Sequence, residues 1–182
     1  LAPRRWYYGA LILNQTYIDI QKGDVIRAVN ALVGLSAQEQ EFLDVQSALL
    51  GKSRWLSPDT PGRESREEAL LPINLVLEFM GRARDAATLT EAEKVRLADA
   101  FLGEKIAMLG RQFEVVGVYD WEKMNALVDI DGERLTPFDP VEMEKLFQEE
   151  GTPDPESVQR YIHHSFRDVV ITGEHVLGNL GG

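Results

Sequence analysis

Helix-start signals recur along this chain, and they are the feature that most narrows its expected fold. A hydroxyl or carboxylate side chain just before a helix accepts a hydrogen bond from a backbone N–H group that is otherwise unpaired. Residues 36–39 (SAQE) and 90–93 (TEAE) have the capping-box pattern, in which a glutamate three residues later returns the bond. Asp139-Pro140 and Asp154-Pro155 place an aspartate before a proline, which is well tolerated at the first helical position. These signals favour a mainly α-helical fold.

The spacing of apolar residues extends the signals into predicted helices. Apolar side chains recur every three or four positions from Thr90 to Phe113, which predicts a helix of more than five turns. The same spacing predicts helices over residues 24–34, capped by its first aspartate, over 69–86, and from 155 to about 170. Residues 6–17 are apolar nearly all round, as in a helix buried inside a bundle.

One region has strand character instead. Residues 113–119 read FEVVGVY and are rich in β-branched and aromatic side chains. Asp131-Gly132 then stands between alternating apolar and polar residues, which is a hairpin signal. We therefore predict a mainly α protein, a multi-helix bundle of about seven helices with a small β-hairpin element near residues 114–136. A chain of 182 residues can bury a core without disulfide or metal support, so we expect one helical domain over residues 1–182.

Acidic residues are unevenly distributed along the chain. The whole chain has 30 acidic and 19 basic residues and a net charge of −11, which argues against a nucleic-acid-binding surface. Residues 120–156 contain twelve acidic and three basic residues, so this segment carries −9 of that charge. It serves either as a well-solvated surface or as a face that attracts a protein with a basic surface. For such a face we select Asp129, Asp131, Glu142, Glu144, Glu149 and Glu150.

Residues 51–68 contain turn-forming residues throughout and no apolar periodicity. A connection of this length in a compact domain is usually either mobile or functional. Trp55 lies within it, and an aromatic side chain in a loop can anchor a partner, so we add it to the candidate partner-binding residues. The alternative is that Trp55 folds back onto the core and pins the loop, because a large aromatic ring gains more from burial than from staying exposed for a partner.

Signatures of catalysis are missing from the sequence. It contains no nucleophile elbow, phosphate-binding loop, dinucleotide fingerprint or HExxH pattern, and it has no cysteine. We therefore expect a non-enzymatic, acidic interaction module, partner-binding or inhibitor-like, without a cofactor. The alternative is a metal-dependent hydrolase that uses His164 and Asp168, four apart on one helix face, together with His175. A structural subunit of a larger assembly, including a homo-oligomer, is a third reading.

The compartment stays open at this stage. The apolar run at residues 9–13 is far too short to span a bilayer, and we expect a soluble protein. The chain begins with Leu1, which fits a trimmed or cleaved N-terminal segment. Both a cytoplasmic protein and one exported after such a cleavage are compatible with this start.

Overall fold

The computed structural model describes residues 17–41, 43–58, 66–82, 85–128, 134–137, 139–150 and 162–178. Within them the chain forms seven strands and only five short α-helices, besides four 3₁₀ turns. The strands are β1 (Ile18–Lys22), β2 (Val25–Val29), β3 (Ala31–Leu35), β4 (Glu68–Pro72), β5 (Lys105–Met108), β6 (Arg111–Tyr119) and β7 (Val169–Gly173). The α-helices are α1 (Ile73–Phe79), α2 (Glu91–Phe101), α3 (Trp121–Asn125), α4 (Pro140–Glu150) and α5 (Glu174–Gly178). The 3₁₀ turns are η1 (Ala37–Glu41), η2 (Val45–Ser47), η3 (Ala86–Thr88) and η4 (Phe166–Asp168).

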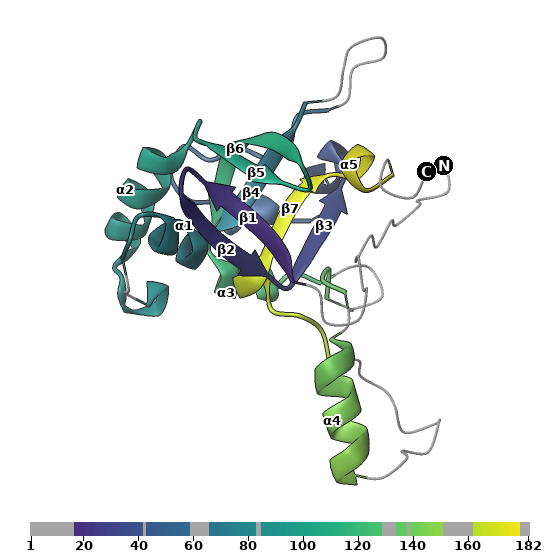
Figure 1. Cartoon of the computed structure of the whole chain (residues 1–182). Coiled ribbons are helices and arrows are strands. Elements are labelled where there is room, and N and C mark those ends of the chain that lie inside the picture. The colour runs from purple at the N-terminus through teal and green to yellow at the C-terminus, as the bar shows by residue number, and fades with distance from the viewer. Residues whose placement is uncertain are drawn as a thin grey trace.

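All seven strands belong to one mixed sheet in the order β2-β1-β5-β6-β4-β7-β3. The pairs β4–β6 and β3–β7 are parallel, and the other neighbouring pairs are antiparallel. β2 and β3 lie at opposite ends of this order, yet Asn30 alone connects them in the chain. Because one residue joins the two edges, the sheet curls on itself into a nearly closed barrel (Figure 1). The predicted mainly α multi-helix bundle is therefore wrong.

The helix predicted over residues 24–34 is replaced by β2 and β3. Lys22 pairs with Val25 across β1 and β2, so Gly23 and Asp24 form a two-residue turn. Gly23 has a φ of 58°, a left-handed conformation that glycine adopts without a steric penalty. Asp24 thus belongs to a hairpin turn and does not begin a helix. The Gly-Asp pair between alternating residues was a hairpin signal in the sequence, but β-branched residues at helical spacing concealed it.

The helix predicted from Thr90 to Phe113 is correct in its first half. Thr90 and Glu93 form the predicted capping box, with the Glu93 N–H donating to the Thr90 hydroxyl at 3.3 Å. The α-helix nevertheless ends at Phe101. Gly103 follows with a φ of 81°, and its N–H donates to the Val115 carbonyl 2.8 Å away, so the chain turns toward the sheet.

The remaining apolar residues of that predicted helix lie in the hairpin of β5 and β6. Ile106 and Met108 are buried and stand two residues apart, as strand geometry requires. Ile106 pairs directly with Phe113. The strand predicted over residues 113–119 is confirmed as part of β6.

One further helix prediction fails in part, and another lies almost wholly outside the described residues. The segment 69–86 begins as β4, which is buried along its whole length, and becomes helical only at α1. An apolar run of this kind suits a buried strand as well as a buried helix. Of the helix predicted over residues 6–17, only Tyr17 is described. In the predicted hairpin, Val128 and Arg134 form an isolated antiparallel bridge, and residues 129–133 lie outside the description.

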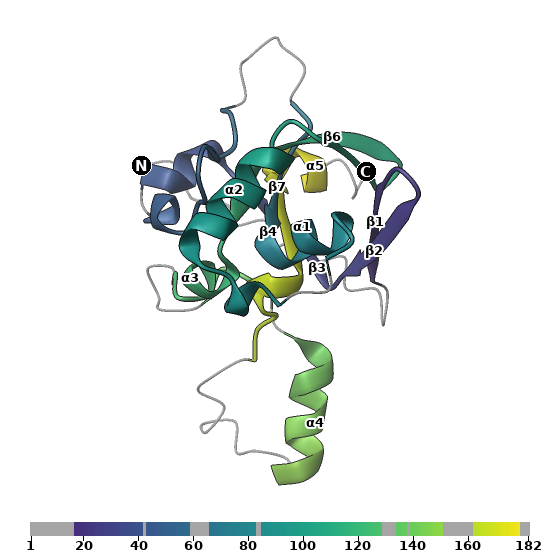
Figure 2. The ribbon, with the colours of Figure 1, turned by 90° about the vertical axis from the view of Figure 1, so that its left-hand side faces the viewer.

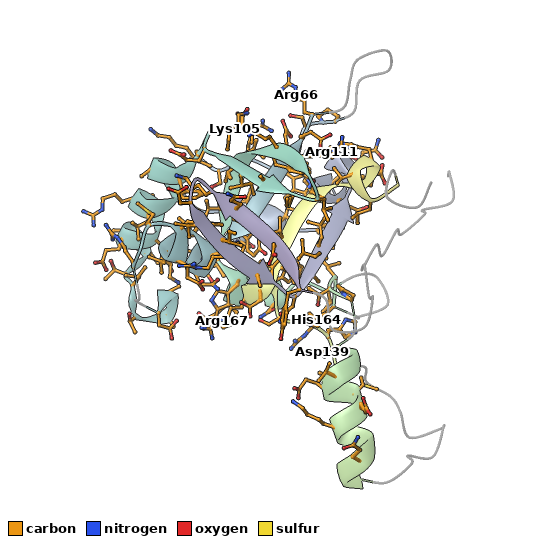
Figure 3. All side chains as sticks on the ribbon, in the orientation of Figure 1. Arg66, Lys105, Arg111, Asp139, His164 and Arg167 are labelled. Atoms are coloured by element: carbon orange, nitrogen blue, oxygen red, sulfur yellow. The ribbon has the colours of Figure 1, made fainter. Side chains whose placement is uncertain are left out.

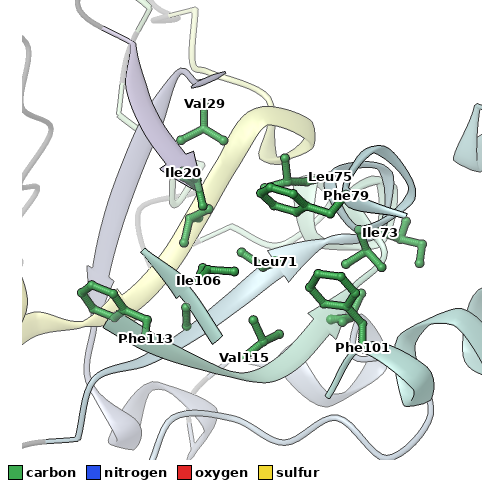
Figure 4. Packing of buried hydrophobic residues seen from close by; sticks show 14 of the residues in the cluster. Ile20, Val29, Leu71, Ile73, Leu75, Phe79, Phe101, Ile106, Phe113 and Val115 are labelled. Carbon is green, nitrogen blue, oxygen red and sulfur yellow. The ribbon is translucent and has the colours of Figure 1, made fainter. Parts of the chain in front are cut away.

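Two apolar clusters form the core, and together they cover both faces of the strands β3, β4 and β7. The first cluster packs the sheet against α1 and α2, where the rings of Phe79 and Phe101 stack with centroids 6.1 Å apart (Figure 4). The second cluster contains Tyr119 and Phe166, whose rings meet edge to face at 5.9 Å. None of the helices that the structure describes is long and apolar enough to cross a membrane.

Candidate functional site

Helix α4 projects from one end of the barrel in two perpendicular views (Figures 1 and 2). Asp139 caps it: one carboxylate oxygen, Oδ1, accepts from the backbone N–H groups of Val141 and Glu142 at 3.0 and 3.1 Å. Pro140 occupies the first helical position, where an N–H group would lack an intrahelical partner. The helix start predicted from Asp139-Pro140 is therefore confirmed.

The base of α4 is tied to the barrel by a short stem, in which residues 135–137 and Asp139 run antiparallel to residues 162–165. The Asp139 N–H donates to the Ile162 carbonyl at 2.6 Å, and the His164 N–H donates to the Pro137 carbonyl at 3.0 Å. The Thr136 hydroxyl adds a bond of 2.7 Å to the His164 carbonyl. Backbone hydrogen bonds therefore fix the position from which the helix extends.

His164 contributes a charge contact to this stem. Its Nδ1 atom lies 3.2 Å from Oδ2 of Asp139 but has no well-aligned hydrogen bond among the described residues. The two groups form an ion pair only when the imidazole is protonated. Burial raises the pKa of the nearby Asp168 carboxyl, and the charges of Arg167 and His164 oppose that rise. Asp139 thus caps α4 with one oxygen and faces His164 with the other.

The metal-site alternative is not assembled by this fold. His164 and Asp168 do not share a helix, because the predicted helix over residues 155–170 is replaced, in its described part, by an extended segment, the turn η4 and the start of β7. His175 lies in α5, beyond the far end of β7, and a five-residue strand spans about 16 Å. No group of three or more His, Asp or Glu side chains suited to a metal ion occurs among the described residues.

The acidic residues selected from the sequence fall partly on α4. Glu142 and Glu144 are exposed there. The Glu142 carboxylate lies 2.5 Å from the Lys145 ammonium group, and Glu144 accepts a hydrogen bond of 3.2 Å from the Gln148 amide. Glu149 and Glu150 lie in the last turn of α4, where the structure describes the backbone alone. Asp129 and Asp131 lie outside the described residues.

Asp120, one of the twelve acidic residues of the segment 120–156, is buried. Its Oδ2 lies 2.6 Å from the ammonium group of Lys94, which is also buried, and its Oδ1 accepts from the backbone N–H of Glu122. Burial opposes ionisation of Asp120, but the hydrogen bond and charge of Lys94 outweigh burial, so its pKa is lowered. This carboxylate joins α2 to the start of α3 and adds nothing to an acidic surface.

Trp55 is buried, with 3% of its surface exposed. Its indole N–H donates to the Ser36 carbonyl at 3.1 Å, and its ring packs in the second apolar cluster. The neighbouring Arg54 N–H donates to the Val116 carbonyl at 3.1 Å, so this part of the loop lies along β6. Trp55 thus folds back onto the core, and we leave it out of the proposed binding surface.

Arg66, Lys105 and Arg111 lie at the end of the barrel opposite α4 (Figure 3). Together with Arg54, which shares the Glu68 carboxylate with Arg66, we call them the basic patch. Arg54 and Arg66 lie 2.8 and 3.9 Å from the buried carboxylate of Glu68, Lys105 lies 2.8 Å from Glu114, and Arg111 pairs with Glu67. Sequence reasoning missed this patch, because its members come from separate segments and only the pairing of β4, β5 and β6 brings them together.

Comparisons with protein-family models, curated proteins and solved structures find no match to this chain.

Proposed function

We propose that this chain is a non-enzymatic interaction module whose helix α4 presents carboxylates to a protein with a basic surface. The observation that carries the proposal is the placement of α4, which extends away from the barrel while its base is fixed by the stem (Figure 2). A helix held in this way offers its side chains to a partner without rearrangement of the fold. An ordered binding element also loses less conformational entropy when it binds.

We call α4 and its capping aspartate, residues 139–150, the arm. The charge of the arm supports a basic partner. From Asp139 to Glu150 the sequence has five acidic residues against Lys145 as the single base. The one base pairs with Glu142 at the surface, and an exposed pair of this kind contributes little energy. Carboxylates gathered on a projecting helix produce a negative field, which speeds the approach of a cationic surface and weakens as salt is added.

A decalysine peptide labelled with a fluorophore is a suitable probe, because it carries positive charge without any specific shape. We expect its binding, followed by fluorescence anisotropy, to be clear at about 0.05 M salt and nearly lost at about 0.5 M. The double variant Glu142→Lys/Glu144→Lys should bind the peptide at least about tenfold more weakly, because it reverses two charges of the arm.

The matched control is Asp24→Lys/Glu41→Lys, which reverses two exposed carboxylates, one in the turn between β1 and β2 and one at the end of η1. Both double variants change the formal net charge from −11 to −7, so they differ only in where the change lies. Equal weakening in both would mean that net charge alone attracts the peptide. Unchanged binding of the arm variant would refute the proposal outright.

A further inference from the structure

We infer that the basic partner is a second copy of this chain, with the α4 arm of one copy docked on the basic patch of the next. The inference rests on the proposed function and adds the identity of the partner. Its first support is position: Arg66, Lys105 and Arg111 lie at one end of the molecule, whereas Asp139 and α4 lie at the other (Figure 3). An arm and a patch at opposite ends cannot meet within one copy.

The second support is the relative exposure of the charges in the patch. The side chains of Arg66, Lys105 and Arg54 are 69%, 57% and 46% exposed. Two of the carboxylates beneath them are much less exposed, Glu68 at 6% and Glu67 at 22%. At Glu68 and Glu67 the cation is the more exposed partner, whereas Glu114 is 47% exposed beside Lys105 at 57%. The four cations outnumber the three carboxylates paired with them. A negatively charged helix approaching this end meets the cations first.

The third support is size. Helix α4 has eleven residues and is about 16 Å long. The patch crosses three neighbouring strands, β5, β6 and β4, which cover about 10 Å, and Arg54 in the adjoining loop widens it. One helix laid across the strands can therefore reach from one side of the patch to the other.

The contact inferred here joins two different surfaces, so each copy keeps a free arm at one end and a free patch at the other. Head-to-tail contacts of this kind build rings or open filaments and do not stop at a symmetric dimer. Because the attraction is between charges near the surface, added salt should dissociate the assembly.

Light scattering after size-exclusion chromatography tests the inference with the full chain and two neutralising variants. The arm variant is Glu142→Gln/Glu144→Gln, and the patch variant is Arg66→Gln/Lys105→Gln. Arg54 is left unchanged because it holds the buried carboxylate of Glu68. Each variant alone should be monomeric, whereas the wild type at low salt and high concentration should show a weight-average mass at least about twofold higher.

An equimolar mixture of the two variants gives the decisive result. The arm variant still has a patch and the patch variant still has an arm, so the mixture should form heterodimers and no larger species. The inference would be overturned if the wild type stayed monomeric at low salt. It would also be overturned if either variant alone still assembled. A mixture that forms no heterodimer would overturn it too. The proposed function is judged separately by decalysine binding, so an arm that binds the peptide without self-association would refute the second copy alone.

Discussion

The ammonium group of Lys94 lies 2.6 Å from the carboxylate of Asp120, and both side chains are buried where α2 meets the start of α3. Burial lowers the pKa of a lysine, but here the hydrogen bond and charge of Asp120 outweigh it, and the pKa of Lys94 is raised. Asp120 also accepts backbone hydrogen bonds from Glu122 and Lys123. Each charge is thus stable in the interior only while the other is present.

Replacing Lys94 by methionine should destabilise the protein by about 3 kcal/mol, because it leaves Asp120 as an unpaired buried carboxylate. Urea denaturation followed by circular dichroism measures this change in the free energy of unfolding. The double variant Lys94→Met/Asp120→Asn should lose clearly less than the sum of the single variants. Additive losses would show that the two side chains act independently.

Stability should fall at acid pH partly through Glu68. Burial opposes its ionisation, but the hydrogen bonds from Arg54 and Ser57 outweigh burial, so the pKa of Glu68 is lowered in the folded protein. A carboxyl whose folded pKa lies below its unfolded value of about 4.3 stabilises the protein above that value. The contribution disappears as the pH falls through the folded pKa.

Glu68→Gln tests this linkage in a series of urea denaturations between neutral and acid pH. The variant should be less stable than the wild type at neutral pH, and the two stability curves should converge below about pH 4. A constant difference over the whole series would mean that Glu68 acts through packing and not through its charge.

Asp139→Ala should speed the hydrogen exchange of the backbone amides in α4 more than His164→Ala does. The first change removes the helix cap, worth about 1 kcal/mol, together with the contact to His164, whereas the second removes the contact alone. Hydrogen–deuterium exchange measured by mass spectrometry on peptides from α4 reports this directly. Faster exchange should be confined to α4 and the stem, and equal protection of α4 in both variants would contradict the capping role.

Gly103→Ala should destabilise the protein by about 1 kcal/mol or more, because alanine is strained at a φ of 81°. A Cβ atom at this position would meet nothing within 4 Å, so the cost comes from the backbone conformation alone. Asparagine tolerates the left-handed region better, and Gly103→Asn should therefore melt at a higher temperature than Gly103→Ala. The reverse order would mean that the left-handed backbone is not what glycine provides here.

Local signals in the sequence predicted local structure well. The caps at Thr90 and Asp139 were found correctly because their bonds join residues within four positions of one another. The hairpin of β5 and β6 was missed although Ile106 and Met108 alternate, since Ile106, Leu109 and Phe113 also continue the helical spacing of α2. Where one set of apolar residues satisfies both periods, only the partner segment decides between strand and helix.

The sequence by itself determined the caps at Thr90 and Asp139, the strand at residues 113–119 and the excess of negative charge in residues 139–150. Tertiary structure alone decided the barrel, because β3 pairs with β7 and β4 with β6, and these partners lie far apart in the chain. It also placed Asp120 inside beside Lys94 and brought the basic patch together opposite the arm. A cap is specified by the energy of a few neighbouring residues, whereas the pairing of distant strands and the burial of a charge depend on which surfaces meet after the chain has closed.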